Sequence, residues 1–302
     1  MTKLLLIGRG QIGQALARDL IGFDLHVWPH DLDDLSTEAL DVIGPDAIVN
    51  AAGKTNLSWC EENAREAMRS NLEAPVRLYT RILDHNRELG VGPGSPRHTR
   101  YIHFSSGCVW DGPYTDDGKP FTPDIPPSPA CLYSWTKAAA DAMLMDLDST
   151  QLAILRPRQV YSSSPSTRNT LTKLMAYPRL VDTPNSVSSM SIIAKTLSHV
   201  VNASEDWSGI WNVYDPGVVT PFEIGEMLFQ AGLRGEPQRI PKADLDKFHT
   251  PRRVDTVLYD ERFEAAIQPH GVIIELNRAI NELRDRIANE LDAPVAVGAS
   301  VS

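Results

Sequence analysis

Short apolar runs alternate with longer amphipathic stretches through the first half of the chain. The apolar runs cover residues 4–7, 25–28, 46–50, 101–105 and 152–155. Each is only four or five residues long and is dominated by Leu, Ile, Val and aromatic side chains. That length and composition predict five buried strands.

Helical periodicity fills the intervals between the predicted strands. Residues 11–21 and 134–147 repeat apolar side chains at helical spacing, and residues 61–89 form a longer helical stretch with a predicted interruption near Pro75. Strand–helix alternation of this kind predicts an α/β fold, a Rossmann-like doubly wound parallel sheet with helices on both faces.

The alternation loosens after Arg156. Residues 191–203 and 221–231 are predicted helices with a strand at 210–213 between them, and residues 274–291 form a final amphipathic helix. The tail, residues 292–302, is small and apolar without periodicity, and we expect it to be disordered.

Two loops interrupt the pattern. Residues 90–98 contain three glycines and two prolines and predict a surface connection. Residues 111–129 contain six prolines, which excludes a regular element. The second loop is either a simple linker or a wall of the site that follows it in the sequence.

Composition narrows the functional classes. The 302 residues carry a formal net charge of −10, which argues against nucleic acid or an anionic membrane as the main partner. No apolar run approaches the roughly 20 residues of a membrane span, and the N-terminus resembles no signal peptide, so a cytoplasmic protein is expected. The three cysteines lack metal-site spacing and the histidines are scattered, so no metal is expected.

A glycine-rich turn directly follows the first predicted strand and opens the first helix. It reads Gly8-Arg9-Gly10-Gln11-Ile12-Gly13. Glycines at this spacing permit a tight turn and let a pyrophosphate approach the N–H groups of the helix N-terminus. The context, strand before and helix after, predicts a dinucleotide site.

Two residues bear on which dinucleotide binds. Asp31 lies 18 residues after Gly13, where an acid accepts hydrogen bonds from the ribose of NAD. Arg9 could instead pair with the 2′-phosphate of NADPH. We expect NADPH or NADH, and Arg9 favours NADPH.

Tyr133 and Lys137 are four residues apart on one predicted helix. That spacing places both side chains on the same face. An ammonium beside a phenol lowers the phenol pKa from about 10 and makes it a usable general acid or base. Taken alone, this spacing is a weak signal.

Together these motifs resemble the extended short-chain dehydrogenases/reductases. Within that family the chain is most similar to the dTDP-4-dehydrorhamnose reductase group of nucleotide-sugar reductases. The resemblance spans about residues 3–290. Matching segments, in family order, are residues 8–13, 50–53, 60–61, 71, 105–112, 133–137, 155–157, 160–161, 209–213 and 252–255.

The resemblance implies roles for individual residues. The catalytic set would be Ser106, Tyr133 and Lys137: Tyr133 donates a proton to the sugar C4 alkoxide, Ser106 stabilises its charge, and Lys137 lowers the Tyr133 pKa and holds the nicotinamide ribose. The implied cofactor site comprises Gly8, Arg9, Gly10, Gln11, Ile12, Gly13, Asp31, Asn50, Ala51, Ala52, Gly53, Tyr133 and Lys137. The implied substrate site comprises Ser106, Gly107, Cys108, Arg168 and Asn169.

The resemblance also implies a domain organisation. Residues 1–158, with 186–214 added, would form the dinucleotide-binding domain. Residues 159–185 and 215–291 would form a smaller, discontinuous C-terminal α/β region for the nucleotide-sugar, where Lys173, Arg252 and Arg253 are further candidates for its phosphates. A homodimer is a further expectation.

Departures from the family pattern keep alternatives open. The glycine loop is one residue short, and Cys108 stands where the reductase group often has Tyr. A cysteine two residues after the catalytic serine is the epimerisation acid/base of the related GDP-fucose synthases, so Cys108 could serve an epimerase or an epimerase-reductase. Residues 162–176 lack the histidine that those enzymes pair with it. A non-catalytic dinucleotide-binding regulatory subunit is the third alternative.

Overall fold

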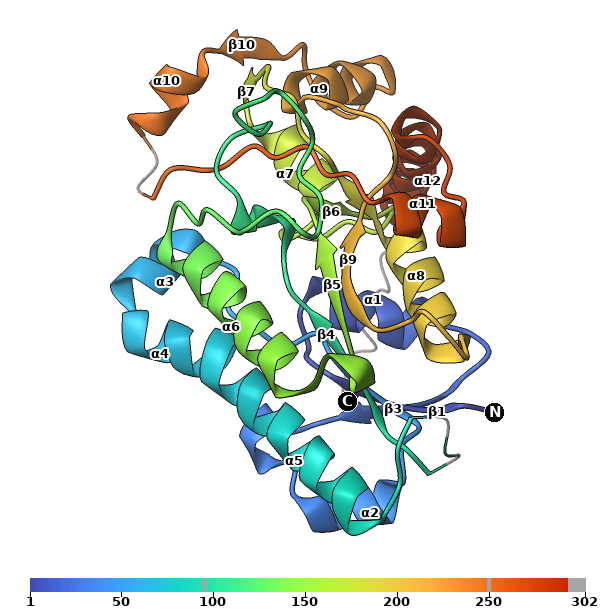
Figure 1. Cartoon of the computed structure of the whole chain (residues 1–302). Coiled ribbons are helices and arrows are strands. Elements are labelled where there is room, and N and C mark those ends of the chain that lie inside the picture. Colours follow the sequence, from blue (N-terminus) through green and yellow to red (C-terminus); the bar gives the residue numbers. More distant parts are fainter. Residues whose placement is uncertain (94, 96, 249–250, 293–302) are drawn as a thin grey trace, which may run out of the picture.

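A six-stranded, fully parallel sheet forms the centre of the computed structural model, which describes residues 1–93, 95, 97–248 and 251–292 (Figure 1). Its strand order is β2-β1-β3-β4-β5-β9. The strands are β1 (Lys3–Ile7), β2 (Asp24–Trp28), β3 (Ala47–Asn50), β4 (Arg100–Phe104), β5 (Leu152–Pro157) and β9 (Gly209–Val213). The five strands predicted in the first half, the strand near 210–213 and the Rossmann-like class are therefore confirmed.

The sheet is buried on both faces because its strands are apolar at successive positions. In β1, Leu4 and Leu6 point into one core cluster, whereas Leu5 and Ile7 point into another. Helices α1 (Gln11–Asp19) and α8 (Met190–Asn202) cover the first face. Helices α2 (Thr37–Ile43), α5 (Ala74–Glu88) and α6 (Leu132–Asp148) cover the second.

The chain reverses its direction across the sheet between β1 and β3. From β1 it moves outward to β2, and it then crosses back to place β3 on the other side of β1. In doubly wound sheets the crevice at the carboxyl ends of the strands flanking such a reversal binds the ligand. The turn after β1 opens at this crevice.

The long helical stretch predicted at 61–89 is divided. It consists of α3 (Leu57–Glu62), α4 (Ala64–Met68), a π-helical turn η2 (Arg69–Glu73) and α5. Pro75 lies in the first turn of α5, directly after the π turn, and it lacks the N–H that a helix interior uses for hydrogen bonding. The predicted interruption is confirmed, and the π turn is its form.

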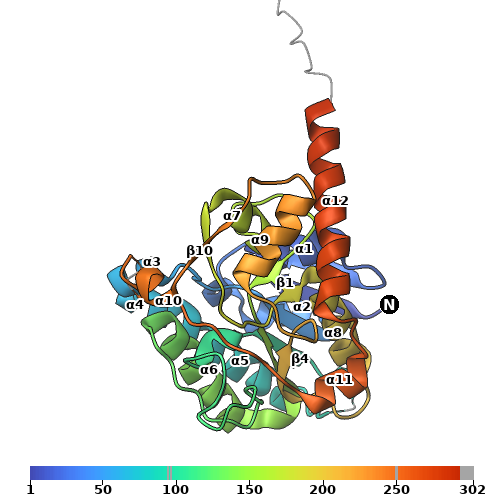
Figure 2. The same ribbon diagram turned by 90° about the horizontal axis from the view of Figure 1, so that it is seen from above.

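The remaining elements gather beyond the carboxyl ends of the strands, at the top of Figure 1. A third apolar core holds several of them together, with Phe222, Leu228, Leu276 and Leu283 among its members. The long helix α12 packs along their edge, as Figure 2 shows. The elements are β6 (Val160–Tyr161), α7 (Thr170–Ala176), β7 (Arg179–Val181), β8 (Ser188–Ser189), α9 (Pro221–Gln230), β10 (Gln238–Ile240), α10 (Lys242–Asp246), α11 (Glu261–Ile267) and α12 (Val272–Asp292).

The predicted helices of the second half correspond to α8, α9 and α12, and α12 extends through Asp292. The rest of the tail, residues 293–302, lies outside the described residues. The short pairs β6–β8 and β7–β10 were not predicted, because two- and three-residue strands have no readable period. The domain boundaries stay a prediction.

The proline-rich loop at 111–129 has no helix or strand, as expected, but it is firmly attached. Phe121 pairs with Leu258 in an isolated parallel bridge and stacks on Trp110 at a ring distance of 5.2 Å. The Trp110 indole donates to the Ile125 carbonyl at 3.1 Å. Arg252 forms an ion pair with Asp111, so the loop is fixed to the C-terminal segment at its start and near its middle.

Candidate active site

The helix α6 carries Tyr133 in its first turn and Lys137 in the next. Cys131 is its N-cap residue and offers no side-chain cap. Instead, the Glu61 carboxylate on α3 accepts a hydrogen bond from the Leu132 N–H at 2.8 Å. Glu61 therefore caps the helix from outside, and it stabilises the N-terminal turn that presents the tyrosine.

Lys137 is buried with 3% of its surface exposed. Its Nζ donates to the carbonyl of Phe104, the last residue of β4, at 2.9 Å. A Cβ on Gly53 would lie 3.5 Å from the same Nζ, so the lysine also borders the loop after β3. Burial lowers the pKa of Lys137 to about 8, although the charge of Asp141 acts in the opposite direction.

Tyr133 is 7% exposed, and Ser106 lies beside it. Burial raises the pKa of the Tyr133 phenol, the nearby Cys108 thiol adds to the increase, and a hydrogen bond with the Ser106 hydroxyl opposes it. The sequence reasoning expected Lys137 to lower this pKa. Burial raises the pKa instead, and the Lys137 ammonium, which donates to the Phe104 carbonyl, is not among the groups that lower it.

Cys108 is held by an arginine that the sequence analysis missed. Nη1 of Arg158 donates to the Cys108 Sγ at 2.7 Å, and Nε donates to the Asn185 amide oxygen at 3.1 Å. Arg158 is only 4% exposed and also donates to the Val254 carbonyl. The next residue, Gln159, has a left-handed backbone at φ 41°. No local pattern marks an arginine after a strand as buried, so the sequence offered no signal.

The glycine loop has no room for side chains at two of its three positions. A Cβ on Gly8, whose φ is +114°, would lie 2.5 Å from the Ala51 carbonyl carbon, and a Cβ on Gly13 would lie 2.0 Å from the Gly8 oxygen. Gly10 has an ordinary backbone (φ −78°), and a Cβ there would meet only Arg168 Nη1, at an ordinary contact distance of 3.8 Å. The close packing and the uncapped N-terminus of α1 fit a pyrophosphate-binding cradle.

Arg9 and Asp31 both lie near the end of β2. Nη2 of Arg9 donates to the Pro29 carbonyl at 2.5 Å, which brings its guanidinium to the crevice side of that strand. Asp31 is exposed, and its carbonyl accepts from the Trp28 indole at 3.0 Å. The contacts of Arg9 and Asp31 with an adenosine ribose stay a prediction.

The segment 50–53 is shaped by two buried asparagines. Asn50 has no exposed surface, and its side chain bonds the Tyr101 hydroxyl at 2.9 Å and the Ala52 N–H at 3.0 Å. Asn71, in the π turn, bonds both backbone groups of Lys54, at 2.8 and 3.0 Å. Asn50 thus acts on a ligand only through the backbone it orders, and Asn71 joins the set of positioning residues.

Asn169 and Arg168, which were predicted together, have different surroundings. Asn169 has no exposed surface, and its amide bonds Ser162 and Ser164 as well as the N-terminus of α7. The predicted substrate role of Asn169 is wrong on this geometry, because all its polar atoms serve the loop. Arg168 is exposed, and its Nη1 lies 3.8 Å from where a Cβ on Gly10 would stand.

Arg168 is one of three neighbouring cationic side chains, together with Lys173 and Arg253. Burial lowers the pKa of Lys173, and the charges of Arg253 and Arg168 lower it further. Three cations from two distant segments therefore lie within electrostatic reach of each other. Such a group suits a ligand with several negative charges.

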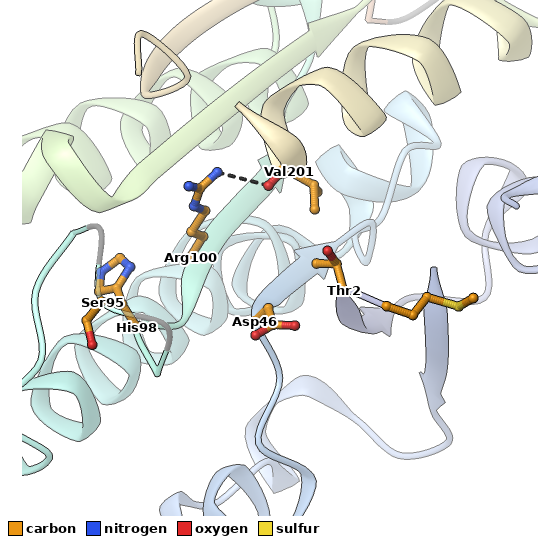
Figure 3. A pocket seen from close by; sticks show the side chains of 7 residues that line it. Thr2, Asp46, Ser95, His98, Arg100 and Val201 are labelled. Atoms are coloured by element: carbon orange, nitrogen blue, oxygen red, sulfur yellow. Dashed lines mark hydrogen bonds between the residues drawn. The ribbon is translucent and has the colours of Figure 1, made fainter. Parts of the chain in front are cut away.

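A separate pocket lies at the amino ends of the strands, on the side of the sheet away from the glycine loop, and Figure 3 shows it from close by. Its walls include Thr2, Asp46, His98 and Arg100, close to the amino ends of β1, β3 and β4. Arg100 donates to the carbonyls of Val201 and Ala203 at the end of α8, at 2.9 and 2.8 Å. This pocket contains none of the predicted catalytic residues. In the described part of the chain, no group of three or more His, Cys, Asp or Glu could hold a metal ion, and no helix there is long and apolar enough to cross a membrane.

Residues 4–180 match the family model described as the NAD dependent epimerase/dehydratase family. That segment includes the glycine loop, Ser106, Tyr133 and Lys137. The chain belongs to this family. The resemblance inferred from the motifs is therefore confirmed at the level of family and fold.

Curated relatives of this chain carry several linked activities. A trifunctional UDP-glucose 4,6-dehydratase/UDP-4-keto-6-deoxy-D-glucose 3,5-epimerase/UDP-4-keto-L-rhamnose-reductase of Arabidopsis thaliana is 31% identical over 74% of this chain and 33% of its own length. A bifunctional dTDP-4-dehydrorhamnose 3,5-epimerase/dTDP-4-dehydrorhamnose reductase of the same plant is 31% identical over 62% of this chain and 60% of its own. The chain thus spans about one third of the first relative and three fifths of the second.

Solved structures share the fold at lower identity. The UDP-rhamnose synthase of Acanthamoeba polyphaga mimivirus superposes with a TM-score of 0.79 at 18% identity, covering 93% of this chain and 99% of that one. A dTDP-4-dehydrorhamnose reductase of Bacillus anthracis, in complex with NADP, superposes with a TM-score of 0.76 at 16% identity, covering 93% of this chain and 99% of that one.

Proposed function

We propose that this chain reduces the 4-keto group of a nucleotide-activated deoxysugar, with a dTDP-sugar as the first candidate. The observation that carries the proposal is the convergence of Ser106, Tyr133 and Lys137 at the carboxyl end of β4, next to a glycine cradle that fits a dinucleotide. Family membership and the rhamnose-forming activities in the names of the relatives support it. The product would enter deoxysugar biosynthesis.

The residues of the chain divide the work of such a reduction. NADPH or NADH, when bound, supplies the hydride, and Arg9 at the end of β2 favours NADPH. Tyr133 holds the proton that the new alkoxide takes. Its raised pKa keeps that proton in place at neutral pH, which suits a general acid. Ser106 donates a hydrogen bond to the same oxygen, and the Lys137 ammonium lowers the cost of its negative charge.

Lys173 and Arg253, whose charges reach each other, are the proposed site for the phosphates of the substrate. Charge-assisted hydrogen bonds from several cations favour a diphosphate. A homodimer is also proposed, and sedimentation at several protein concentrations tests it independently of activity.

Replacement of Tyr133 tests the reductase proposal. Tyr133→Phe removes the proton and keeps the ring, so kcat for NADPH oxidation with a 4-keto-sugar nucleotide should fall at least about 100-fold. Tyr177→Phe is the matched control, because Tyr177 is 48% exposed and lies outside the proposed site. A Tyr133→Phe rate close to the control would contradict the mechanism. Absence of oxidation with any keto-sugar would favour the regulatory alternative.

Epimerisation through Cys108 is a second candidate, and one contact favours it. The Arg158 guanidinium holds Sγ at 2.7 Å beside Ser106 and Tyr133, where the sulfur would take a proton from the carbon next to the keto group and return it. Both relatives quoted above are also named as epimerases. Cys108→Ser should abolish solvent deuterium incorporation at sugar carbons while sparing reduction. Exchange at the wild-type rate in that variant would refute the role.

A further inference from the structure

Hydrogen bonds within the loop at residues 162–169 hold Arg168 next to the glycine loop. Its backbone lies between Ser166, whose hydroxyl accepts from the Arg168 N–H at 3.3 Å, and the fully buried Asn169. The Asn169 side chain bonds the carbonyls of Ser162 and Ser164 at 2.8 and 2.9 Å. The loop that carries the arginine is therefore preorganised.

A shared carbonyl fixes the distance between this loop and the dinucleotide cradle. The Val160 oxygen accepts from the Gln11 side chain at 3.2 Å and from the Thr170 hydroxyl at 2.9 Å. Gln11 belongs to the first turn of α1, and Thr170 opens α7. These two bonds place the guanidinium of Arg168 over Gly10, at 3.8 Å from the position of a Cβ there.

The charge at this point is unbalanced. Within the described residues, the Arg168 guanidinium makes no hydrogen bond or ion pair, and the first turn of α1 contains no acidic residue. The partial positive charge of the helix N-terminus and a full positive charge thus face the same space. In this fold the pyrophosphate of the dinucleotide lies over that turn.

We propose that Arg168 binds the pyrophosphate of the dinucleotide cofactor and closes the cradle from the side opposite the glycines. This assigns the residue to the cofactor, whereas the sequence predicted a contact with the sugar nucleotide. The inference rests on the proposed function only for the presence of a dinucleotide, and it holds whichever sugar is reduced.

Equilibrium binding without any sugar nucleotide tests the assignment. The affinities of NADPH, NADH and ADP-ribose for the wild type and for Arg168→Gln are measured by fluorescence titration. All three ligands contain the pyrophosphate, so all three should lose about 10-fold or more in affinity, by a similar factor. Arg168→Lys should recover part of the loss, because a point charge replaces a bidentate fork.

Arg9→Gln serves as the matched comparison. Arg9 lies at the end of β2, so its replacement should weaken NADPH and leave NADH and ADP-ribose nearly unchanged. Loss of NADPH affinity alone in Arg168→Gln would overturn the pyrophosphate assignment. Unchanged affinities together with a raised KM for the sugar nucleotide would overturn it as well and return Arg168 to the substrate site.

The two proposals fail in different ways. If the chain reduces no keto-sugar but Arg168→Gln still weakens all three dinucleotide ligands, the inference stands and the proposed function falls. Since Arg168 is exposed, urea unfolding of the ligand-free variant should match the wild type, which separates a binding defect from a folding defect.

Discussion

Replacing Gly13 with alanine should distort the glycine loop and abolish dinucleotide binding. The new Cβ would stand 2.0 Å from the Gly8 oxygen and 2.9 Å from its carbon, whereas real Cβ atoms keep at least 3.0 Å from such neighbours. The two backbone segments would have to separate by at least 1 Å. Gly8 has little space to retreat into, because an atom placed on its Cα would lie 2.5 Å from the Ala51 carbonyl carbon and 2.6 Å from the Ala52 nitrogen.

The cost follows from this geometry. Ordinary overpacking of a core costs about 1–3 kcal/mol, and that figure assumes side chains that can shift. Here both partners are backbone, so we expect a loss in the free energy of unfolding of at least about 3 kcal/mol. Folded domains have only about 5–15 kcal/mol in total. The variant should therefore be severely destabilised and should bind no dinucleotide.

Two other glycines separate crowding from backbone strain. Gly22→Ala places a Cβ in open space at φ +86° and should cost only about 1 kcal/mol. Gly10→Ala should leave unfolding unchanged within about 0.5 kcal/mol, since its backbone is ordinary, but should weaken dinucleotide binding by filling the approach to the cradle. Urea unfolding and fluorescence titration measure both quantities. A Gly13→Ala protein as stable as Gly22→Ala would refute the reasoning.

Three further outcomes follow from buried charges. Because burial holds the pKa of Lys137 at about 8, kcat/KM should decline above pH 8 as its ammonium loses a proton, and a profile flat to pH 10 would contradict this. Burial raises the pKa of Asp215 from 3.8 to about 7, so between these pH values the folded state binds one proton more than the unfolded state. The free energy of unfolding should therefore fall by up to about 4 kcal/mol as pH rises through that window. In urea unfolding at several pH values, Asp215→Asn should reduce this pH dependence. Asp141 pairs with Arg156 at 2.8 Å, and only 2% of each side chain is exposed. Asp141→Ala leaves the buried Arg156 charge without its partner and should lower the free energy of unfolding in urea by about 3–5 kcal/mol. A loss below about 1 kcal/mol would contradict this expectation.

The central sheet could be predicted because the sequence of each strand, taken by itself, indicates a strand. Most are short apolar runs, because burial on both faces of a parallel sheet favours that composition, whereas the edge strand β2 is largely exposed. The glycine loop and the Tyr133–Lys137 pair were recognisable for a similar reason, since their chemistry depends on spacing within one segment.

Properties that depend on distant segments were not predictable. Arg158 becomes a partner of Cys108 only when Asn185 and Val254 enclose it. The direction of the Tyr133 pKa depends on how completely the fold removes water, which the four-residue spacing does not report. Neighbours in sequence can also differ in burial, as the separate surroundings of Arg168 and Asn169 demonstrate.

The π turn at Arg69–Glu73 sets how α3 is oriented relative to α5. A π turn contains one residue more than the α turn it replaces, and each residue advances an α-helix by about 100°. Deleting Ser70 would convert η2 to an ordinary turn and rotate α3 by about that angle relative to α5. Glu61 would then face away from the N-terminus of α6. The one extra residue of the π turn thus determines how α3 is rotated relative to α5, and with it whether Glu61 reaches the N-terminus of α6.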